Sequence, residues 1–323
     1  MASVFVFPGQ GSQFVGMGKE ISENFKEARL VFEEVDDALS QNLSKIIFEG
    51  PEEDLNLTEN TQPALMAVSL AVFKVLIQQG GIVLKERISY VAGHSLGEYS
   101  ALTAASGLEI SACARLLKLR GQAMQKAVPV GYGSMAAILG LDFKDVQGIT
   151  EEVSGGTGEN GQKELICESA NDNSKGQVVV SGHKQAVDMA VEKAKNMGAK
   201  KAVALPVSAP FHCTLMAPAA QKMATTLADT DIRPPEVPLV SNVTAKAESD
   251  PAEIRRLLVD QVTHMVRWRE SVSWMIENGV DHVYEIGAGK VLSGLIKRVD
   301  RSVTTTPVGN TEQIEAAIKE LSA

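Results

Sequence analysis

A short apolar run that passes directly into a helical pattern places the strongest constraint on how this chain folds. The run Ser89–Ala92 is followed by the pentapeptide GHSLG at 93–97 and then by the helical pattern Glu98–Ser106. Glycine at both ends of the pentapeptide permits a sharp strand-to-helix turn, which exposes the serine hydroxyl beside the free N–H groups of the helix start. The pattern favours Ser95 as a nucleophile, with the N–H of Leu96 as an oxyanion donor, over a plain tight turn.

Short apolar runs alternate with longer helical patterns along much of the chain. Such alternation is typical of an α/β domain with a mostly parallel sheet. We therefore expect a large α/β-hydrolase-like domain, made of residues 1–130 and 200–323. Its predicted strands are Ser3–Phe7, Tyr90–Ala92, Pro238–Val240 and His282–Ile286.

The middle of the chain has a different order of predicted strands and helices, which indicates a small inserted subdomain, residues 131–199. From Gly133 onward the order reads strand, helix, strand, strand, helix, strand, which is the ferredoxin-like βαββαβ pattern. A cleft between the two domains is a common place for a ligand. The predicted elements are Ser134–Leu139, Phe143–Val153, Leu165–Ala170, Gln177–Ser181, Gln185–Met197 and Lys201–Pro206.

Bulk composition narrows the class of protein. The 323 residues are 44% hydrophobic and 22% charged, as in an ordinary globular protein. A formal net charge of −9 argues against nucleic-acid binding, which depends on Lys and Arg neutralising phosphates. The three cysteines lack the spacing of a metal site or a disulfide framework, and we interpret them as buried thiols of a reducing cytosol. They are Cys113, Cys167 and Cys213.

Neither a secretory signal nor a membrane span is expected. Met1–Phe7 has no basic region and no long apolar run, so it is interpreted as a first strand. The most apolar stretch, Ala64–Ile77, contains Ser69 and Lys74 and looks too short to cross a bilayer. We interpret it as a buried helix and expect a cytoplasmic protein without a membrane partner.

A serine nucleophile needs a base, and His212 is the favoured candidate. It lies in a proline-marked loop directly after the predicted strand at 202–206, and such loops place catalytic groups in α/β domains. A histidine satisfied within the core remains the alternative. The other histidines, which are interpreted as structural or surface residues, are His94, His183, His264 and His282.

Arg120 occupies an unexpected position on its helix. Over Ile110–Ala127 it falls in the apolar stripe of Cys113, Leu117 and Met124. A buried arginine needs a partner, because a lone buried charge is expensive. That partner is either an internal Asp or Glu, or a substrate carboxylate that the guanidinium would bind with two parallel hydrogen bonds. The residues alone leave both possibilities open.

Two glycine-containing turns fail the tests for phosphate loops. After Gly9 and Gly11, the segment has Phe14 where a dinucleotide-binding loop needs glycine. The run Glu285–Lys290 also lacks its third glycine. No nucleotide or metal site is indicated, and no cofactor is expected.

Taken together, seven segments closely resemble the malonyl-CoA:acyl carrier protein transacylases of bacterial type II fatty acid synthesis. The likeness follows the whole chain in order and is far more specific than GxSxG alone. The segments are FPGQGSQ, GHSLGEYSAL, LKLRGQAM, SAPFHC, PLVSNVTA, DQVTHMVRW and EIGAGKVLSGLIKR.

This resemblance implies a role for each matching position. Ser95 would carry the malonyl group as an ester, and His212 would move protons, oriented by a backbone carbonyl rather than by an acidic side chain. Arg120 would bind the malonyl carboxylate, with Gln261 lining the same pocket. The remaining implied residues are Gln10 and Leu96, whose N–H groups would form the oxyanion hole, and Phe211, whose ring would exclude an α-methyl group and so favour malonyl over methylmalonyl.

The resemblance also implies the partners, malonyl-CoA and acyl carrier protein, and we expect a monomer. An acidic carrier would need a basic rim, for which solvated helix faces are the alternative explanation. The competing functions are a freestanding enzyme that loads a polyketide synthase, a serine hydrolase or thioesterase, and a binding subunit without chemistry. The basic candidates are Lys118, Lys126, Arg267, Arg269, Lys290, Lys297 and Arg298.

Overall fold

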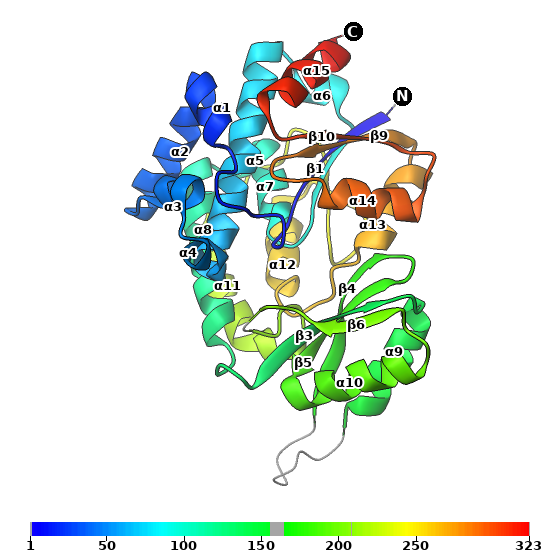
Figure 1. Cartoon of the computed structure of the whole chain (residues 1–323). Coiled ribbons are helices and arrows are strands. Elements are labelled where there is room, and N and C mark those ends of the chain that lie inside the picture. Colours follow the sequence, from blue (N-terminus) through cyan, green and yellow to red (C-terminus); the bar gives the residue numbers. More distant parts are fainter. Residues whose placement is uncertain (1, 156–164, 208, 323) are drawn as a thin grey trace.

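The computed structural model describes residues 2–155, 165–207 and 209–322, and contains two separate sheets (Figure 1). The larger sheet has six strands in the order β10-β9-β1-β2-β7-β8. Neighbours from β10 to β7 are parallel, and only β8 is antiparallel. The strands are β1 (Ala2–Phe7), β2 (Tyr90–Gly93), β7 (Leu239–Val240), β8 (Ala247–Glu248), β9 (Val280–Ile286) and β10 (Thr304–Val308). The predicted mostly parallel α/β sheet is confirmed.

Both faces of the large sheet are covered by helices, as alternation along β1 demonstrates. Phe5 and Phe7 pack into the core on one face, whereas Val4 and Val6 pack into a second core on the other. The first face is covered by α5 (Thr58–Gly80) and α7 (Gly97–Ala104), and the second by α13 (Trp268–Glu277) and α14 (Val291–Val299).

The other helices of this part pack around these layers, and both chain ends lie at the edge far from the small sheet (Figure 1). They are α1 (Lys19–Asn24), α2 (Lys26–Leu39), α3 (Leu43–Glu49), α4 (Glu52–Asn56), α6 (Leu84–Arg87), α8 (Ile110–Lys126), the short η1 (Thr214–Met216), α11 (Ala217–Ala228), α12 (Pro251–Asp260) and α15 (Thr311–Ser322).

Helix α5 contains the predicted buried helix Ala64–Ile77 but is longer than expected. It runs for 23 residues, because polar Asn60 and Gln62 are buried within the same helix. By length and composition alone the whole of α5 is sufficient to cross a membrane, but 72% of its most apolar window is buried inside the protein, as expected for a buried helix.

The smaller sheet has four antiparallel strands in the order β4-β5-β3-β6. The chain order of its elements is βαββαβ, as expected, with α9 (Phe143–Val153) and α10 (Lys184–Asn196) enclosing a core of their own. The strands are β3 (Gly133–Leu139), β4 (Cys167–Ser174), β5 (Gln177–His183) and β6 (Lys201–Ala204). Because β6 pairs with β3, the small sheet extends beyond residue 199.

Strand β4 joins the two parts. Val266 forms a bridge to Asn171, its N–H donates to Ala170 O at 2.8 Å, and its carbonyl accepts from the N–H of Asp172 at 3.0 Å. The carboxylate of Asp172 is paired with Arg269 at 2.7 Å. These contacts hold the small sheet against the segment that precedes α13.

Candidate active site

Ser95 lies in a strained turn between β2 and α7. Its φ of 53° is in the left-handed region, which serine rarely adopts. The glycines of the pentapeptide are required for this turn, since a Cβ on Gly93 would lie 1.9 Å from Gly97 O and a Cβ on Gly97 would lie 2.2 Å from Phe7 O. The predicted strand, sharp turn and helix are confirmed.

Asn242, which follows β7, holds this turn in place with two side-chain hydrogen bonds. Its Oδ1 accepts from the N–H of Ser95 at 2.8 Å, and its Nδ2 donates to Gly93 O at 2.7 Å. The side chain is fully buried. The N–H of Ser95 itself is therefore occupied and does not face a ligand.

His212 reaches Ser95 from the loop that follows β6. Its Nε2 lies 2.7 Å from Ser95 Oγ, and its Nδ1 lies 2.8 Å from the backbone oxygen of Gln261. A carbonyl can only accept, so Nδ1 carries the proton and Nε2 is free to accept the hydroxyl proton. This orientation by a backbone carbonyl is the one that the resemblance implies.

Burial sets the charge of His212. The residue is 4% exposed, and burial together with the charge of Arg120 lowers the pKa of His212 to about 3. The imidazole is therefore neutral at physiological pH and ready to act as a base. Like Ser95, His212 has a positive φ, 57°, and such strain is common at functional sites.

Arg120 points from α8 to the same serine. Its Nη2 donates to Ser95 Oγ at 3.2 Å and to Gln261 Oε1 at 2.8 Å, while Nη1 donates to Gln62 Oε1 at 2.8 Å. The residue is 1% exposed, and its Nε has no hydrogen-bond partner in the described part of the chain. Among the described residues no Asp or Glu forms an ion pair with Arg120, and its hydrogen-bond partners are uncharged, although the buried Glu98 lies close enough to attract its charge.

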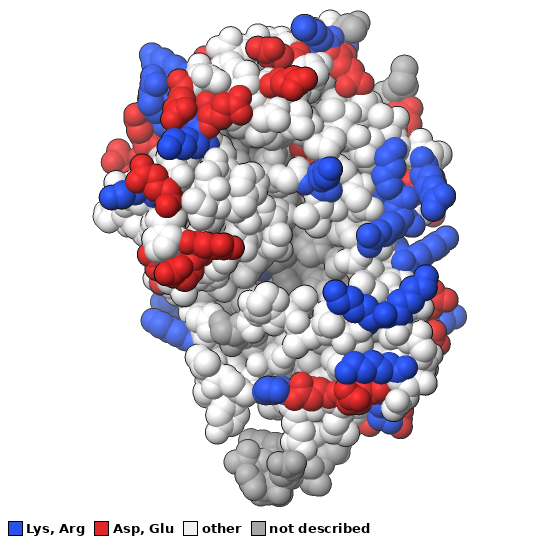
Figure 2. Space-filling model, in the orientation of Figure 1, with Lys and Arg blue, Asp and Glu red and all other residues white. Residues whose placement is uncertain are grey.

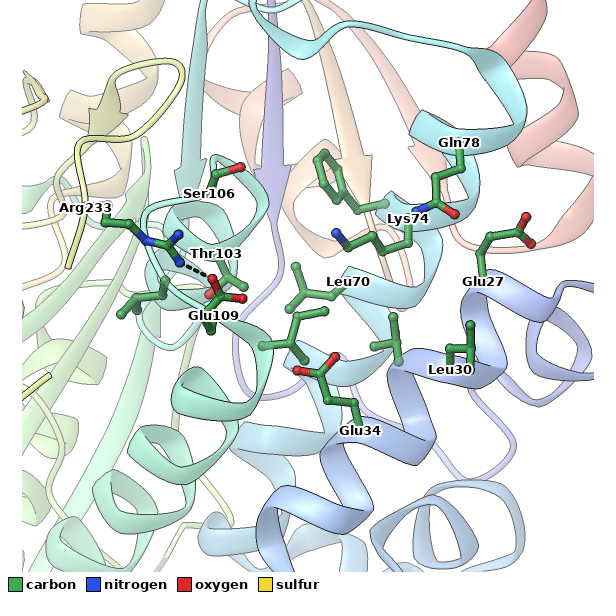
Figure 3. Close-up of a pocket in the computed structure, with 14 residues that line it drawn as sticks. Glu27, Leu30, Glu34, Leu70, Lys74, Gln78, Thr103, Ser106, Glu109 and Arg233 are labelled. Atoms are coloured by element: carbon green, nitrogen blue, oxygen red, sulfur yellow. Dashed lines mark hydrogen bonds and ion pairs between the residues drawn. The ribbon is translucent and has the colours of Figure 1, made fainter. Parts of the chain in front are cut away.

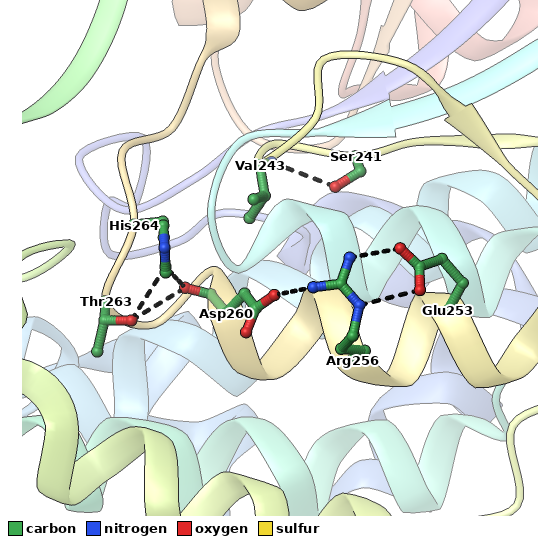
Figure 4. A network of polar contacts seen from close by, with 7 residues as sticks. All are labelled: Ser241, Val243, Glu253, Arg256, Asp260, Thr263 and His264. Carbon is green, nitrogen blue, oxygen red and sulfur yellow. Dashed lines mark hydrogen bonds and ion pairs between the residues drawn. The ribbon is translucent and has the colours of Figure 1, made fainter.

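Gln261 lies directly after α12 and behind the cavity wall rather than on its surface. It is fully buried and donates from Nε2 to Ser95 O at 2.9 Å and to Glu98 Oε2 at 2.5 Å. Figure 4 shows how the helix end is fixed: Arg256 bonds Asp260 at 2.5 Å, and His264 Nδ1 bonds Asp260 O at 2.7 Å. These contacts hold the segment that presents Gln261.

A cavity of about 100 Å³ connects the predicted site residues. It lies between the large sheet's elbow and the small sheet, with Met135 and Asn171 contributing from the latter. Its lining contains six of the seven predicted residues, namely Gln10, Ser95, Leu96, Arg120, Phe211 and His212, with Gln261 behind them.

Of the other histidines, only His94 lines the same cavity among the described residues, and it does not contact Ser95 Oγ. His94 is partly buried, and its Nε2 contacts Asn173 Oδ1 at 2.8 Å across the junction of the two sheets. His183 Nδ1 accepts from the N–H of Ile166, and His282 contacts Thr306. His264 belongs to the α12 end described above.

A different, larger hollow lies apart from this chemistry. Figure 3 shows that α2, α5 and the turn before α8 form it, with Leu30, Leu70 and the ion pair of Glu109 with Arg233 in its wall. None of the predicted site residues lines it.

Three residues of the site were not predicted from the sequence: Asn242, Glu98 and Gln62. The first two lie within segments that carry the resemblance, PLVSNVTA and GHSLGEYSAL, but neither has a spacing that indicates its contacts. Gln62 lies in the helix that begins at Thr58, and only the fold brings it to Arg120.

The sequence matches the family described as "Acyl transferase domain" over residues 4–312. The fold and the serine, histidine and arginine of the site thus occur in a chain that belongs to this family.

Individual relatives show which group of acyl transferases this chain resembles in sequence and fold. The chain is 45% identical over 317 residues to the malonyl CoA-acyl carrier protein transacylase of Bacillus subtilis, covering 98% of this chain and 96% of that one. It is 44% identical to the Escherichia coli K12 protein of the same name, with 98% of both chains covered. A crystal structure of acyl-carrier-protein-S-malonyltransferase from Bartonella henselae is 54% identical, with a TM-score of 0.95 over 100% of both chains. Within the acyl transferases, this chain is a member of the malonyl CoA-acyl carrier protein transacylase family.

Proposed function

We propose that this enzyme transfers the malonyl group of malonyl-CoA to the phosphopantetheine thiol of acyl carrier protein, in fatty acid biosynthesis. One observation carries the proposal: a buried guanidinium, whose hydrogen bonds within the described residues go to uncharged groups, lies 3.2 Å from the hydroxyl of a serine that also contacts a neutral histidine. A carboxylated acyl group on that serine would give the guanidinium a carboxylate to bind directly. The names of the relatives support the same reaction.

In the first half of the reaction, Ser95 Oγ attacks the thioester carbonyl while His212 Nε2 takes the hydroxyl proton. The oxyanion is held by the N–H groups of Gln10 and Leu96, the latter at the start of α7. The tetrahedral intermediate expels the thiolate of CoA, which takes the proton from His212. Malonyl-Ser95 remains.

In the second half, the thiol of the carrier attacks the ester carbonyl. His212 accepts the thiol proton and then returns it to Ser95 Oγ as the ester bond breaks. Arg120 holds the malonyl carboxylate in both halves through its guanidinium. Phe211, in the cavity wall, leaves little room for an α-methyl group.

We infer that the carrier docks beside the basic side of the cavity. Figure 2 shows Lys and Arg side chains along the border formed by α14 and β4, whereas Asp and Glu gather over α3 and α4 on the opposite side. Among the expected rim residues, Lys118, Arg267 and Arg269 have acidic partners. Lys126, Lys290 and Lys297 take part in no ion pair within the described ranges. One solved relative, 41% identical, is a malonyl-transacylase bound to a polyketide acyl-carrier protein.

We also propose a ferredoxin-like fold for residues 131–199, because the strand order fits it; the pairing of β6 with β3 favours a boundary after Ala204. For residues 1–130 and 200–323 we propose a hydrolase-like fold, because the sheet is mostly parallel. We further propose a cytoplasmic monomer. Its three buried, free cysteines fit a reducing compartment. Light scattering of the purified chain tests the monomer.

The deciding experiment incubates the protein with malonyl-CoA alone and measures Ser95 by peptide mass spectrometry, with Ser95→Ala as the control. We expect a malonyl adduct on Ser95, none on the control, and transfer to added holo carrier protein. Steady release of CoA and malonate into water without an adduct would instead identify a hydrolase. A protein that forms no adduct and releases no CoA would be identified as a binding subunit without chemistry.

A further inference from the structure

Glu98 is a buried carboxyl group that the proposed reaction does not use. It lies in the first turn of α7 and is 1% exposed. Its Oε2 accepts from Gln261 Nε2 at 2.5 Å and from the N–H of Asn242 at 3.4 Å. Its Oε1 is buried with no hydrogen-bond partner among the described residues. Only one of the two oxygens is therefore engaged.

The engaged oxygen determines which way the amide of Gln261 faces. An amide presents an acceptor at one corner and two donors at the other. Nε2 of Gln261 donates to Glu98 and to Ser95 O, and Oε1 accepts from Arg120. A flipped amide would point N–H groups at the guanidinium and an oxygen at two other oxygens. Each of these contacts would then be lost or repulsive.

We propose that Glu98 is a positioning residue for carboxylate selection, because its Oε2 holds the Gln261 amide in the one orientation that offers an acceptor to Arg120. This inference rests on the proposed function and extends it. The role assigned to Glu98 is that of a hydrogen-bond acceptor to Gln261, in addition to the attraction between its charge and that of Arg120. The guanidinium contacts the amides of Gln62 and Gln261, and no ion pair joins it to Glu98.

The environment of Glu98 is consistent with an acceptor role. Burial raises the pKa of Glu98 to about 7, although Gln261, Asn242, Arg120 and Ser241 act in the opposite direction. A proton on the partnerless Oε1 would leave Oε2 free to accept as before. The orientation of Gln261 therefore does not require the negative charge.

Two variants separate the effect of the Glu98 side-chain length from the effect of its charge. Glu98→Gln keeps the length of the side chain and an acceptor oxygen but removes the charge, whereas Glu98→Asp keeps the charge but draws the acceptor back by one carbon–carbon bond, about 1.5 Å. The readout is the ratio of Ser95 acylation rates with malonyl-CoA and acetyl-CoA. We expect the Gln variant to stay within about 3-fold of the wild-type ratio and the Asp variant to lose about 10-fold. The opposite order would make Glu98 a counter-charge, and two unchanged ratios would remove it from selection; either result overturns the inference.

Glu285 provides a matched control. It is also a fully buried glutamate, and its two oxygens accept from the N–H groups of Leu292 and Ser293 at 2.9 and 2.7 Å, at the start of α14. Glu285→Asp should lower the melting temperature without changing the malonyl-to-acetyl ratio. A ratio that falls equally in both Asp variants would mean that general loosening is responsible, which contradicts the inference.

If Glu98→Asp does not fold, Gln261→Met tests the same connection, since it removes the amide that Glu98 orients. We expect at least the same 10-fold loss of the ratio, and a retained ratio overturns the inference. Failure of the proposed function is a separate result: a wild-type protein that forms no malonyl adduct on Ser95 fails before any variant is compared.

Discussion

The two sides of the cavity are built differently. On the nucleophile side, Ser95 and His212 both have left-handed backbones, with φ of 53° and 57°, and the histidine is oriented by a main-chain carbonyl. On the carboxylate side, Arg120 projects from a regular helix and is held by the side-chain amides of Gln62 and Gln261. In the proposed reaction, backbone geometry would set the chemistry and side chains would set the selectivity. Selectivity should therefore change more readily than chemistry.

Loss of the base gives the largest expected effect. In His212→Ala, no group accepts the hydroxyl proton of Ser95, so acylation by malonyl-CoA should slow by about 10²- to 10⁴-fold. Stopped-flow release of CoA, followed by mass spectrometry of the adduct, measures this rate. The loss should be equal for malonyl-CoA and acetyl-CoA, because His212 belongs to the nucleophile side alone. A loss confined to malonyl-CoA would contradict the assignment of His212 to the nucleophile side alone.

Loss of the guanidinium should have the opposite signature. Arg120→Ala removes the charged hydrogen bonds to the carboxylate, about 1.5–3 kcal/mol, so the malonyl-to-acetyl preference should fall by about 10- to 100-fold. Competition between the two CoA esters for Ser95 provides the measurement. Arg120→Lys is the matched control: it keeps the charge but not the planar fork, and should recover only part of the preference. An unchanged preference in Arg120→Ala would refute carboxylate binding.

The sequence predicted the nucleophile side more completely than the carboxylate side. Ser95 follows from a local pattern, because strand, turn and helix are consecutive in the chain. The contact of Arg120 with Gln62 joins residues 58 apart, and that of Ser95 with Asn242 joins residues 147 apart. No periodicity encodes such contacts, since they depend on how helices and strands pack. For Arg120 the local stripe indicated burial but could not decide between an internal and an external partner.

The small sheet was predicted for the same local reason. Hydrophobic alternation located its six elements within a few residues, including Phe143–Val153 at both ends. The pattern did not reveal that Asp172 and Val266 join β4 to the segment before α13, because the two residues lie far apart in the sequence.

Opening the wall at Phe211 should produce a smaller change. Phe211→Ala removes the ring from the cavity lining, so methylmalonyl-CoA should gain relative to malonyl-CoA by about 10-fold, the value of one methyl group in a tight pocket. The ratio of the two Ser95 adducts after a mixed incubation is the readout. Phe211→Leu, which keeps more of the volume, should gain less. Equal ratios in both variants and wild type would place the α-carbon of the substrate away from this wall.

The smallest expected effect is an absence of histidine titration. An ordinary imidazole with a pKa of about 6.5 would lose about ten-fold of its basic form between pH 8 and pH 5.5. Because burial and Arg120 lower the pKa of His212 to about 3, it stays neutral across this range, and its share of the acylation rate should stay flat. Because burial raises the pKa of Glu98 to about 7, the profile is measured in wild type and in Glu98→Gln. A falling acid limb near pH 6.5 in both would mean that His212 is hydrated in solution. In that case the neutral form of His212 would depend on substrate binding and not on the backbone geometry of the free enzyme.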